Sequence, residues 1–121
     1  MTMTILTVDD SRTMRDMLRM ALLDAGFRVT QAEDGVHGLE VLDRETPRVI
    51  VTDINMPRLD GFGFIEKVRL NQQYRAIPIL VLTTESDDEK KMRARRAGAT
   101  GWIVKPFDPA KLIAAIRRVT A

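Results

Sequence analysis

The chain has 121 residues, of which 45% are apolar and 30% charged, a composition that suits one compact domain with one hydrophobic core. It contains no cysteine, which excludes a disulfide framework and thiol chemistry, and no apolar stretch approaches the roughly 20 residues of a membrane span. Since the N-terminal residues also lack a basic and apolar cleavable leader, we expect a cytoplasmic protein without membrane association.

The formal net charge of +2 is unevenly distributed. Residues 1–85 hold 10 basic and 13 acidic residues, whereas residues 86–121 hold 9 basic and 4 acidic residues. The last third of the chain can therefore attract an acidic partner. Nucleic acid is not the expected partner, because the basic residues from Lys90 to Arg96 have no stacking aromatics among them and no nucleic-acid-binding motif around them.

Five apolar segments alternate with five helical segments, which predicts an α/β domain with a parallel sheet covered on both faces. The predicted strands cover residues 4–8, 28–32, 48–52, 78–83 and 101–104.

The first predicted helix begins near Ser11 and stops at Gly26. Its apolar residues follow the helical i, i+3, i+4, i+7 spacing, so we expect a buried stripe with methionines in the core: Met14, Met17, Leu18, Ala21, Leu22 and Ala25. Two more helices are predicted over residues 35–44 and 61–71. They are expected to bury Val36, Leu39 and Leu42 in the first and Phe62, Ile65 and Val68 in the second.

The last two helices have clear start signals. The segment Ser86-Asp87-Asp88-Glu89 reads as a capping box with Ser86 as the cap, and this helix should end before Gly98. Asp108 followed by Pro109 places a cap residue before a proline in the first helical position. No linker or repeat remains, so we expect residues 1–121 to form a single domain.

Chemically distinctive residues follow four of the predicted strands. Asp53 comes directly after the apolar run 48–52 and opens a loop that contains Pro57 and Gly61; Asp9 and Asp10 follow the first strand in the same way. Thr83 and Lys105 lie at the ends of two further strands. Ligands of open α/β sheets bind at this edge, so the joint placement favours a site, although each residue alone could be a helix cap, a loop lysine or an ordinary strand residue.

Three clustered carboxylates repel one another and call for a cation. Mg²⁺ prefers oxygen ligands and is typically held by one or two carboxylates together with a phosphate. We therefore interpret the cluster as a phosphoryl-transfer site, with Asp53 as the attacking group and Lys105 and Thr83 as groups that receive the phosphoryl oxygens.

Four blocks of sequence resemble receiver domains of two-component response regulators, and in particular the single-domain, CheY-like chemotaxis receivers. They are Val8-Asp9-Asp10-Ser11, Asp53-Ile54-Asn55-Met56-Pro57 with Asp60-Gly61, Leu82-Thr83-Thr84-Glu85, and Val104-Lys105-Pro106-Phe107. The resemblance runs from Ile5 to about Val119. It implies a flavodoxin-like (βα)5 fold, a doubly wound five-stranded parallel sheet in the order 2-1-3-4-5 with helices on both faces, and a receiver without an output domain.

The resemblance also implies roles for the site residues. Asp53 would be phosphorylated by a histidine kinase. Mg²⁺ would be bound by Asp10, Asp53 and the backbone carbonyl of Asn55, with Asp9 supporting the ion through water. Lys105 would pair with the phosphoryl group, and its peptide bond to the following proline is expected to be cis.

Three further residues concern switching and the lifetime of the phosphoryl group. Thr83 would be the switch hydroxyl. Asn55 and Glu85 match the residues of chemotaxis proteins that lose the phosphoryl group quickly. Trp102 replaces the usual tyrosine or phenylalanine of the switch; it can act as the switch aromatic or simply pack against the fourth helix.

The expected output is a phosphorylation-dependent surface on the fourth helix, fifth strand and fifth helix, comprising Lys90, Lys91, Arg93, Arg95, Trp102 and Lys111. Its partner would be a flagellar motor switch protein or another protein segment with acidic and apolar residues, and the donor a CheA-like kinase. A stand-alone receiver can also be a phosphate sink or a phosphorelay intermediate, and the sequence does not separate these roles.

Two other classes fit less well. Haloacid-dehalogenase-like phosphatases, which are Mg²⁺-dependent aspartyl-phosphate hydrolases, use an acidic residue where this chain has Asn55. A flavodoxin-like cofactor binder is disfavoured because the acidic loop at Asp9 and Asp10 repels phosphate. We therefore expect a signalling protein, not an enzyme, with intrinsic autophosphorylation and autodephosphorylation.

Overall fold

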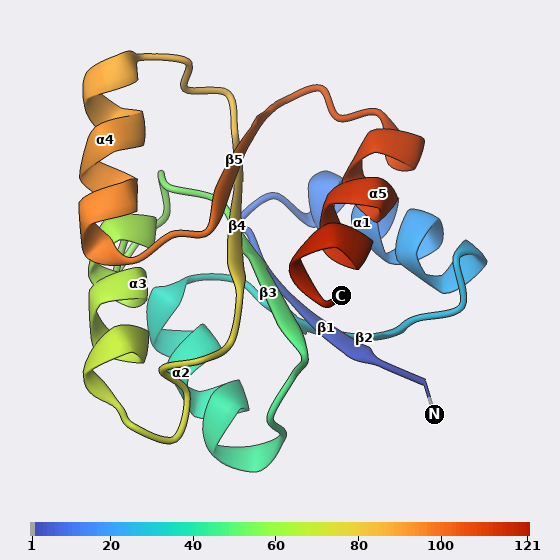
Figure 1. Ribbon diagram of the computed structural model, residues 1–121, viewed down its shortest axis with the longest axis horizontal. Helices are drawn as coiled ribbons and strands as arrows, with labels where there is room; N and C mark the ends of the chain where they lie inside the picture. The colour runs from blue at the N-terminus through green and yellow to red at the C-terminus, as the bar shows by residue number, and fades with distance from the viewer. Residues whose placement is uncertain (1) are drawn as a thin grey trace.

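The computed structural model describes residues 2–121 as five strands that alternate with five helices (Figure 1). The strands are β1 (Thr4–Val8), β2 (Arg28–Ala32), β3 (Val49–Thr52), β4 (Ile79–Thr83) and β5 (Gly101–Val104). The helices are α1 (Arg12–Asp24), α2 (Gly35–Arg44), α3 (Gly61–Leu70), α4 (Asp88–Ala97) and α5 (Pro109–Val119).

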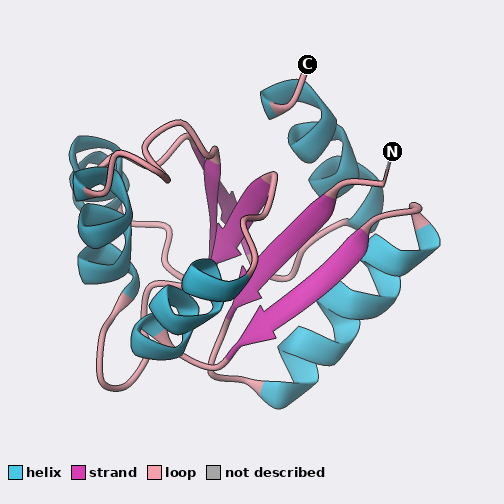
Figure 2. Cartoon of the chain, turned by 90° about the horizontal axis from the view of Figure 1, so that it is seen from below, coloured by secondary structure: helices cyan, strands magenta, loops and turns pink. Residues whose placement is uncertain are grey.

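All strands pair in parallel in the order β2-β1-β3-β4-β5, so the arrowheads in Figure 2 point toward one side of the sheet. This is the expected flavodoxin-like order. Helices α2, α3 and α4 cover one face, and α1 and α5 cover the other (Figure 1). No helix among residues 2–121 is long and apolar enough to cross a membrane.

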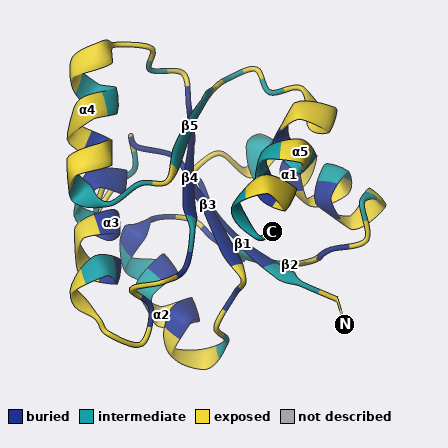
Figure 3. Cartoon of the chain, in the orientation of Figure 1, coloured by how far each residue is buried: buried dark blue, intermediate teal, exposed yellow. Residues whose placement is uncertain are grey.

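The two faces of the sheet form two separate layers of core. Side chains alternate along each strand, so Ile50 packs toward α2, α3 and α4 while Val49 and Val51 pack toward α1 and α5. The inner strands β1, β3 and β4 are therefore buried on both sides and dark in Figure 3, whereas the edge strands β2 and β5 are only partly buried. Such burial explains why the sequences of the inner strands are nearly continuous apolar runs.

Two expectations about helices are wrong in detail. Met17, expected in the core, is 48% exposed, because it lies at the margin of the stripe in which Leu18 and Leu22 are buried and against which Met14 and Ala25 pack partly buried. Helix α4 is capped by Asp87, whose Oδ1 accepts the N–H of Glu89 at 2.8 Å, and Ser86 is not the cap. Asp87 is one residue closer to the first turn than Ser86 and takes the cap position instead, since carboxylates are favoured at the positive end of a helix.

The other helix signals agree with the structure. Asp108 caps α5 with Pro109 at its start, and α4 ends at Gly98, which has a left-handed φ of +119°. In α2, Leu42 is buried as expected, whereas Val36 and Leu39 are only partly buried and Val41 takes their place in the core.

Candidate functional site

The sheet register itself brings the site residues together. Val8 is paired with Thr52, so the next residues along, Asp9 and Asp53, lie side by side where the strands end. The ladder continues into the site, because the N–H of Asp53 donates to the carbonyl of Val8 at 2.9 Å. Lys105 is fixed in the same way by its N–H, which donates to the carbonyl of Thr83 at 2.8 Å.

Three carboxylates gather at this edge, as the sequence predicted. Asp9, Asp10 and Asp53 each offer an oxygen atom, and these atoms lie within 4.8 Å of one another. The Lys105 ammonium lies between two of them, 2.8 Å from Oδ2 of Asp53 and 2.9 Å from Oδ2 of Asp9. One lysine cannot neutralise three carboxylates, so the cluster keeps excess negative charge.

The charged side chains of this cluster, apart from Asp10, are largely buried. The side chain of Asp9 is 2% exposed, that of Lys105 10% and that of Asp53 11%. Burial raises the pKa of Asp9, and this effect exceeds the opposing hydrogen bonds from Lys105 and from the N–H of Ser11. Burial lowers the pKa of Lys105, but its hydrogen bonds with Asp53 and Asp9 outweigh this, and the pKa lies above its ordinary value.

Asp10 differs from its two neighbours because its residue is exposed. It belongs to the loop after β1, which two hydrogen bonds hold in place. The N–H of Ser11 donates to Oδ1 of Asp9 at 2.9 Å, and the Arg15 guanidinium donates to the carbonyl of Asp9 at 2.7 Å. This role of Arg15 is not predictable from the sequence, because an arginine in the first turn of a helix carries no signal of such a contact.

The donor set fits a hard divalent cation. All three side chains offer anionic oxygen, and the excess charge beside a single ammonium is of the sign that Mg²⁺ or a similar ion relieves. Asn55, the other expected ligand residue, lies in the loop that follows Asp53.

Glu85 connects this site to α4 and β5. Its Oε1 accepts a hydrogen bond from the Asn55 amide at 3.0 Å, and its Oε2 pairs with the Lys90 ammonium at 3.1 Å. The Asn55 hydrogen bond, followed by that from Lys90, holds the pKa of Glu85 below its ordinary value. The backbone of Glu85 is held as well: its N–H donates to the buried Thr83 hydroxyl at 3.4 Å, and its carbonyl accepts the Trp102 indole N–H at 3.1 Å.

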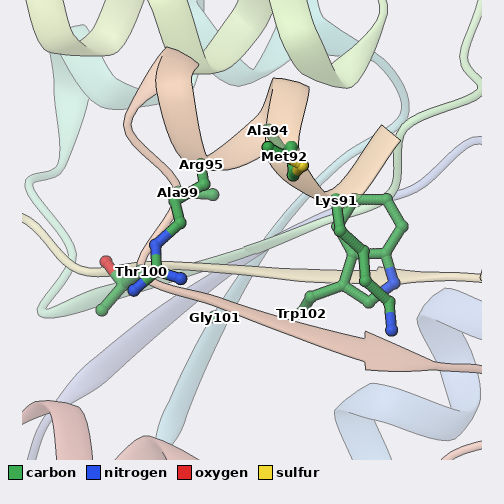
Figure 4. Close-up of a pocket in the computed structure, with 8 residues that line it drawn as sticks. All are labelled: Lys91, Met92, Ala94, Arg95, Ala99, Thr100, Gly101 and Trp102. Atoms are coloured by element: carbon green, nitrogen blue, oxygen red, sulfur yellow. The ribbon is translucent and has the colours of Figure 1, made fainter. Parts of the chain in front are cut away.

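The residues of the expected output surface do not all lie on one surface of the structure. Lys91, Arg95 and Trp102 line a groove of about 270 Å³ between α4 and β5, together with Met92, Ala94, Ala99, Thr100 and Gly101 (Figure 4). Lys90 adjoins the groove and is paired with Glu85. Lys111 is exposed on α5 and does not line it.

Arg93 lies elsewhere. Its guanidinium is 4.0 Å from the centroid of the Phe62 ring, and it lines a second groove, between α3 and α4. The reason is helical geometry: Arg93 is two residues from both Lys91 and Arg95, a spacing that points it to the other side of the helix.

One ion pair near the site was not predicted. Arg58, in the loop after Asp53, makes a bidentate contact with Asp34, the residue that caps α2. Asp34 directly before Gly35 is a recognisable cap signal, but nothing in the sequence indicates that an arginine 24 residues away would share its carboxylate.

Comparison with known proteins agrees with this geometry. The family model for the response regulator receiver domain matches residues 5–117. The chemotaxis protein CheY1 of Helicobacter pylori is 40% identical over 109 residues, covering 88% of this chain and 88% of that protein.

Solved structures give the same picture. The Vibrio cholerae chemotaxis protein CheY4 superposes with a TM-score of 0.94 at 44% identity, covering 98% of this chain and 99% of that one. The receiver domain of sensor histidine kinase PA1611 from Pseudomonas aeruginosa, solved with a magnesium ion coordinated in its active site cleft, superposes with a TM-score of 0.92 at 27% identity and covers 99% of this chain and 98% of that one. The chain therefore belongs to the response regulator receiver family and is a CheY-like receiver.

Proposed function

We propose that this receiver accepts a phosphoryl group on Asp53 from a CheA-like histidine kinase in the cytoplasm, with Mg²⁺ bound, and then controls a protein partner through the groove between α4 and β5. The observation that carries the proposal is the Lys105 ammonium held between Asp9 and Asp53 at the carboxyl edge of the sheet. This arrangement supports the proposal, because the carboxylate that would act as the nucleophile lies beside a fixed positive charge.

In the proposed transfer, an Asp53 carboxylate oxygen forms a bond to phosphorus while the P–N bond of the donor phosphohistidine breaks. The histidine leaves with the bonding electron pair and takes up a proton. Ile54 fixes the other oxygen of Asp53, since its N–H donates to Oδ1 at 2.6 Å. Lys105 then exchanges its contact with the carboxylate for one with a phosphoryl oxygen.

Asp10, Asp53 and the backbone carbonyl of Asn55 would hold Mg²⁺, with Asp9 supporting it through water. When bound, the ion supplies positive charge to the oxygens of the transferred phosphoryl group. The magnesium ion coordinated in the active site cleft of the Pseudomonas aeruginosa receiver supports a Mg²⁺ site in this chain.

The signal would pass through Glu85. A phosphoryl group on Asp53 attracts the Thr83 hydroxyl, which at present accepts the N–H of Glu85. A shift of Glu85 alters two contacts at the groove, the Trp102 indole on its carbonyl and the Lys90 ammonium on its carboxylate. The usual switch aromatic is a tyrosine, whose hydroxyl is its polar group. In Trp102 the indole N–H takes the place of that hydroxyl as the hydrogen-bonding group of the switch.

The lining of the groove favours a partner segment with acidic and apolar residues. Lys91 and Arg95 supply positive charge, while Met92 and Trp102 supply apolar surface. A segment of a flagellar motor switch protein is the expected ligand. A phosphate sink needs no such groove, and this favours an output role over the sink.

The test has two stages. Incubation with acetyl phosphate and Mg²⁺ should add one phosphoryl group by intact mass, and Asp53→Asn should take up none; equal uptake by that variant would overturn the assignment. A fluorescent motor-switch peptide should then bind the beryllofluoride-treated protein more tightly than the untreated one. Phosphorylation without any gain in peptide binding would leave the sink or relay as the function.

A further inference from the structure

The loop between β3 and α3, residues 54–60, is attached to the N-terminus of α2 by an ion pair. Nε of Arg58 lies 2.8 Å from Oδ2 of Asp34, and its Nη2 donates to Oδ1 of Asp34 at 3.1 Å. The side chain of Asp34 is 4% exposed, whereas that of Arg58 is 52% exposed. A planar guanidinium that contacts both carboxylate oxygens fixes direction as well as distance.

A backbone contact runs parallel to the ion pair. The N–H of Gly35 donates to the carbonyl of Leu59 at 3.1 Å, and a Cβ atom at Gly35 would lie only 2.6 Å from that oxygen. The start of α2 and the loop therefore touch closely. Asp34 also accepts the N–H of His37 at 2.9 Å, so one carboxylate both caps α2 and holds the loop.

Arg58 adopts a backbone conformation that its side chain does not favour. Its φ is +64°, and among residues 2–121 it is the only residue other than glycine with a positive φ. Such conformations cost free energy for residues with a Cβ atom and are most easily met by glycine or asparagine. The bidentate contact of Arg58 with the buried Asp34 carboxylate can offset this cost.

The other side of the loop is attached to the opposite flank of the site. The Asn55 amide donates to Glu85 at 3.0 Å, and the N–H of Gly61 donates to the carbonyl of Ile54 at 2.8 Å. The loop is thus held at both ends, and the Asn55 carbonyl lies between the two attachments.

We propose that Arg58 and Asp34 are positioning residues that set the Asn55 carbonyl for metal binding and so increase the affinity for Mg²⁺. The inference rests on the proposed function, because it assumes Mg²⁺ at this carbonyl. Neither residue contacts the ion; both act through the loop.

The sign of the effect separates positioning from simple electrostatics. Arg58→Asn removes a positive charge near a cation site, and Coulomb's law alone would tighten Mg²⁺ binding. Positioning requires the opposite. Asparagine tolerates the left-handed conformation, so this variant loses the ion pair without new backbone strain.

The experiment is a calorimetric Mg²⁺ titration of the full chain and three variants. Arg58→Asn and Asp34→Ser, which keeps a good helix cap, should each raise the Kd by about tenfold, the lower end for groups that orient metal ligands. The double variant should be no weaker than either single one, since both remove the same contact. Arg48→Asn, with the same charge change at the other end of β3, should leave the Kd unaltered.

A second measurement does not need the ion. In metal-free protein, amides of residues 55–60 should exchange with deuterium faster in Arg58→Asn than in the wild type, with the exchange of β1 and β4 unaffected. Unchanged or tighter Mg²⁺ binding by Arg58→Asn, full additivity in the double variant, or no Mg²⁺ binding by the wild type would each overturn the inference. A wild type that binds Mg²⁺ but takes up no phosphoryl group would instead overturn the proposed function alone.

Discussion

Replacing Asp10 with asparagine should stabilise the metal-free protein. Asp10 is the exposed member of the carboxylate cluster, and Lys105 is paired with the other two members, Asp9 and Asp53. Asp10 therefore faces two carboxylates and one ammonium, a net charge of one negative unit. Its own charge is repelled, and Asp10→Asn removes that repulsion without taking a partner from Lys105.

The magnitude follows from the separation of the oxygens. At 4.8 Å, the upper limit on the separation of these oxygen atoms, two unit charges repel by about 0.9 kcal/mol in bulk water and by about 3.5 kcal/mol at an effective dielectric constant of about 20. Because Asp10 is exposed, solvent screening places the gain near the lower figure, about 1 kcal/mol. For a domain of this size that gain raises the melting temperature by roughly 3–5 °C.

The assay is thermal unfolding with and without Mg²⁺. In chelator-treated buffer Asp10→Asn should melt above the wild type. At a Mg²⁺ concentration ten times its Kd, the wild type should gain about 1.4 kcal/mol of stability while the variant gains much less. The difference between their melting temperatures should therefore shrink or change sign. If Asp10→Asn melts below the wild type in chelator-treated buffer, the repulsion argument is refuted. Asp10→Ser provides an independent control for side-chain shape.

Three further outcomes are expected. Lys105→Ala should remain folded and still take up a phosphoryl group, but phosphorylation should no longer change peptide binding, because the ammonium that links the phosphoryl oxygens to the loop after β5 is gone; normal peptide binding would contradict its role. The Arg58 ion pair holds the pKa of Asp34 below its ordinary value of 3.8, so the stability from this group is present at higher pH and is lost as the pH falls through the folded-state pKa. Denaturant unfolding should accordingly show that the difference in the free energy of unfolding between the wild type and Asp34→Ser is constant near neutral pH and disappears in acid. A difference independent of pH would refute the assignment. Trp102→Phe removes the indole N–H from the Glu85 carbonyl, so beryllofluoride with Mg²⁺ should shift the amide resonance of Lys90 less than in the wild type, and an undiminished shift would show that the switch does not pass through this contact.

Local sequence was sufficient for the positions of the strands and most helix ends. Continuous apolar runs are typical of strands buried on both faces, and residues such as Asp108 and Gly98 mark helix ends through local hydrogen bonding and backbone freedom. The resemblance to receiver domains then supplied the strand order, which no local signal carries. The gathering of Asp9, Asp53 and Lys105 followed from that order, since parallel strands end at one edge.

Contacts between segments far apart in the chain could not be predicted in the same way. Met17 satisfies the helical spacing of a core residue, yet it is exposed because the width of the stripe that α1 buries depends on its distance and angle to the sheet. Arg93 was assigned to the output surface from its place in a basic run, and the rotation of α4 directs it to Phe62 instead.

The sequence by itself determined the class of fold, the carboxylate cluster and the lysine opposite it, because each depends on residues fixed at strand ends by a regular parallel sheet. Only the tertiary structure decided the attachment of Arg58 to Asp34, the four contacts of Glu85 and the groove beside Trp102. Those features join loops and helix ends whose relative placement depends on how every layer packs, and no periodicity or motif along the chain encodes such a distance.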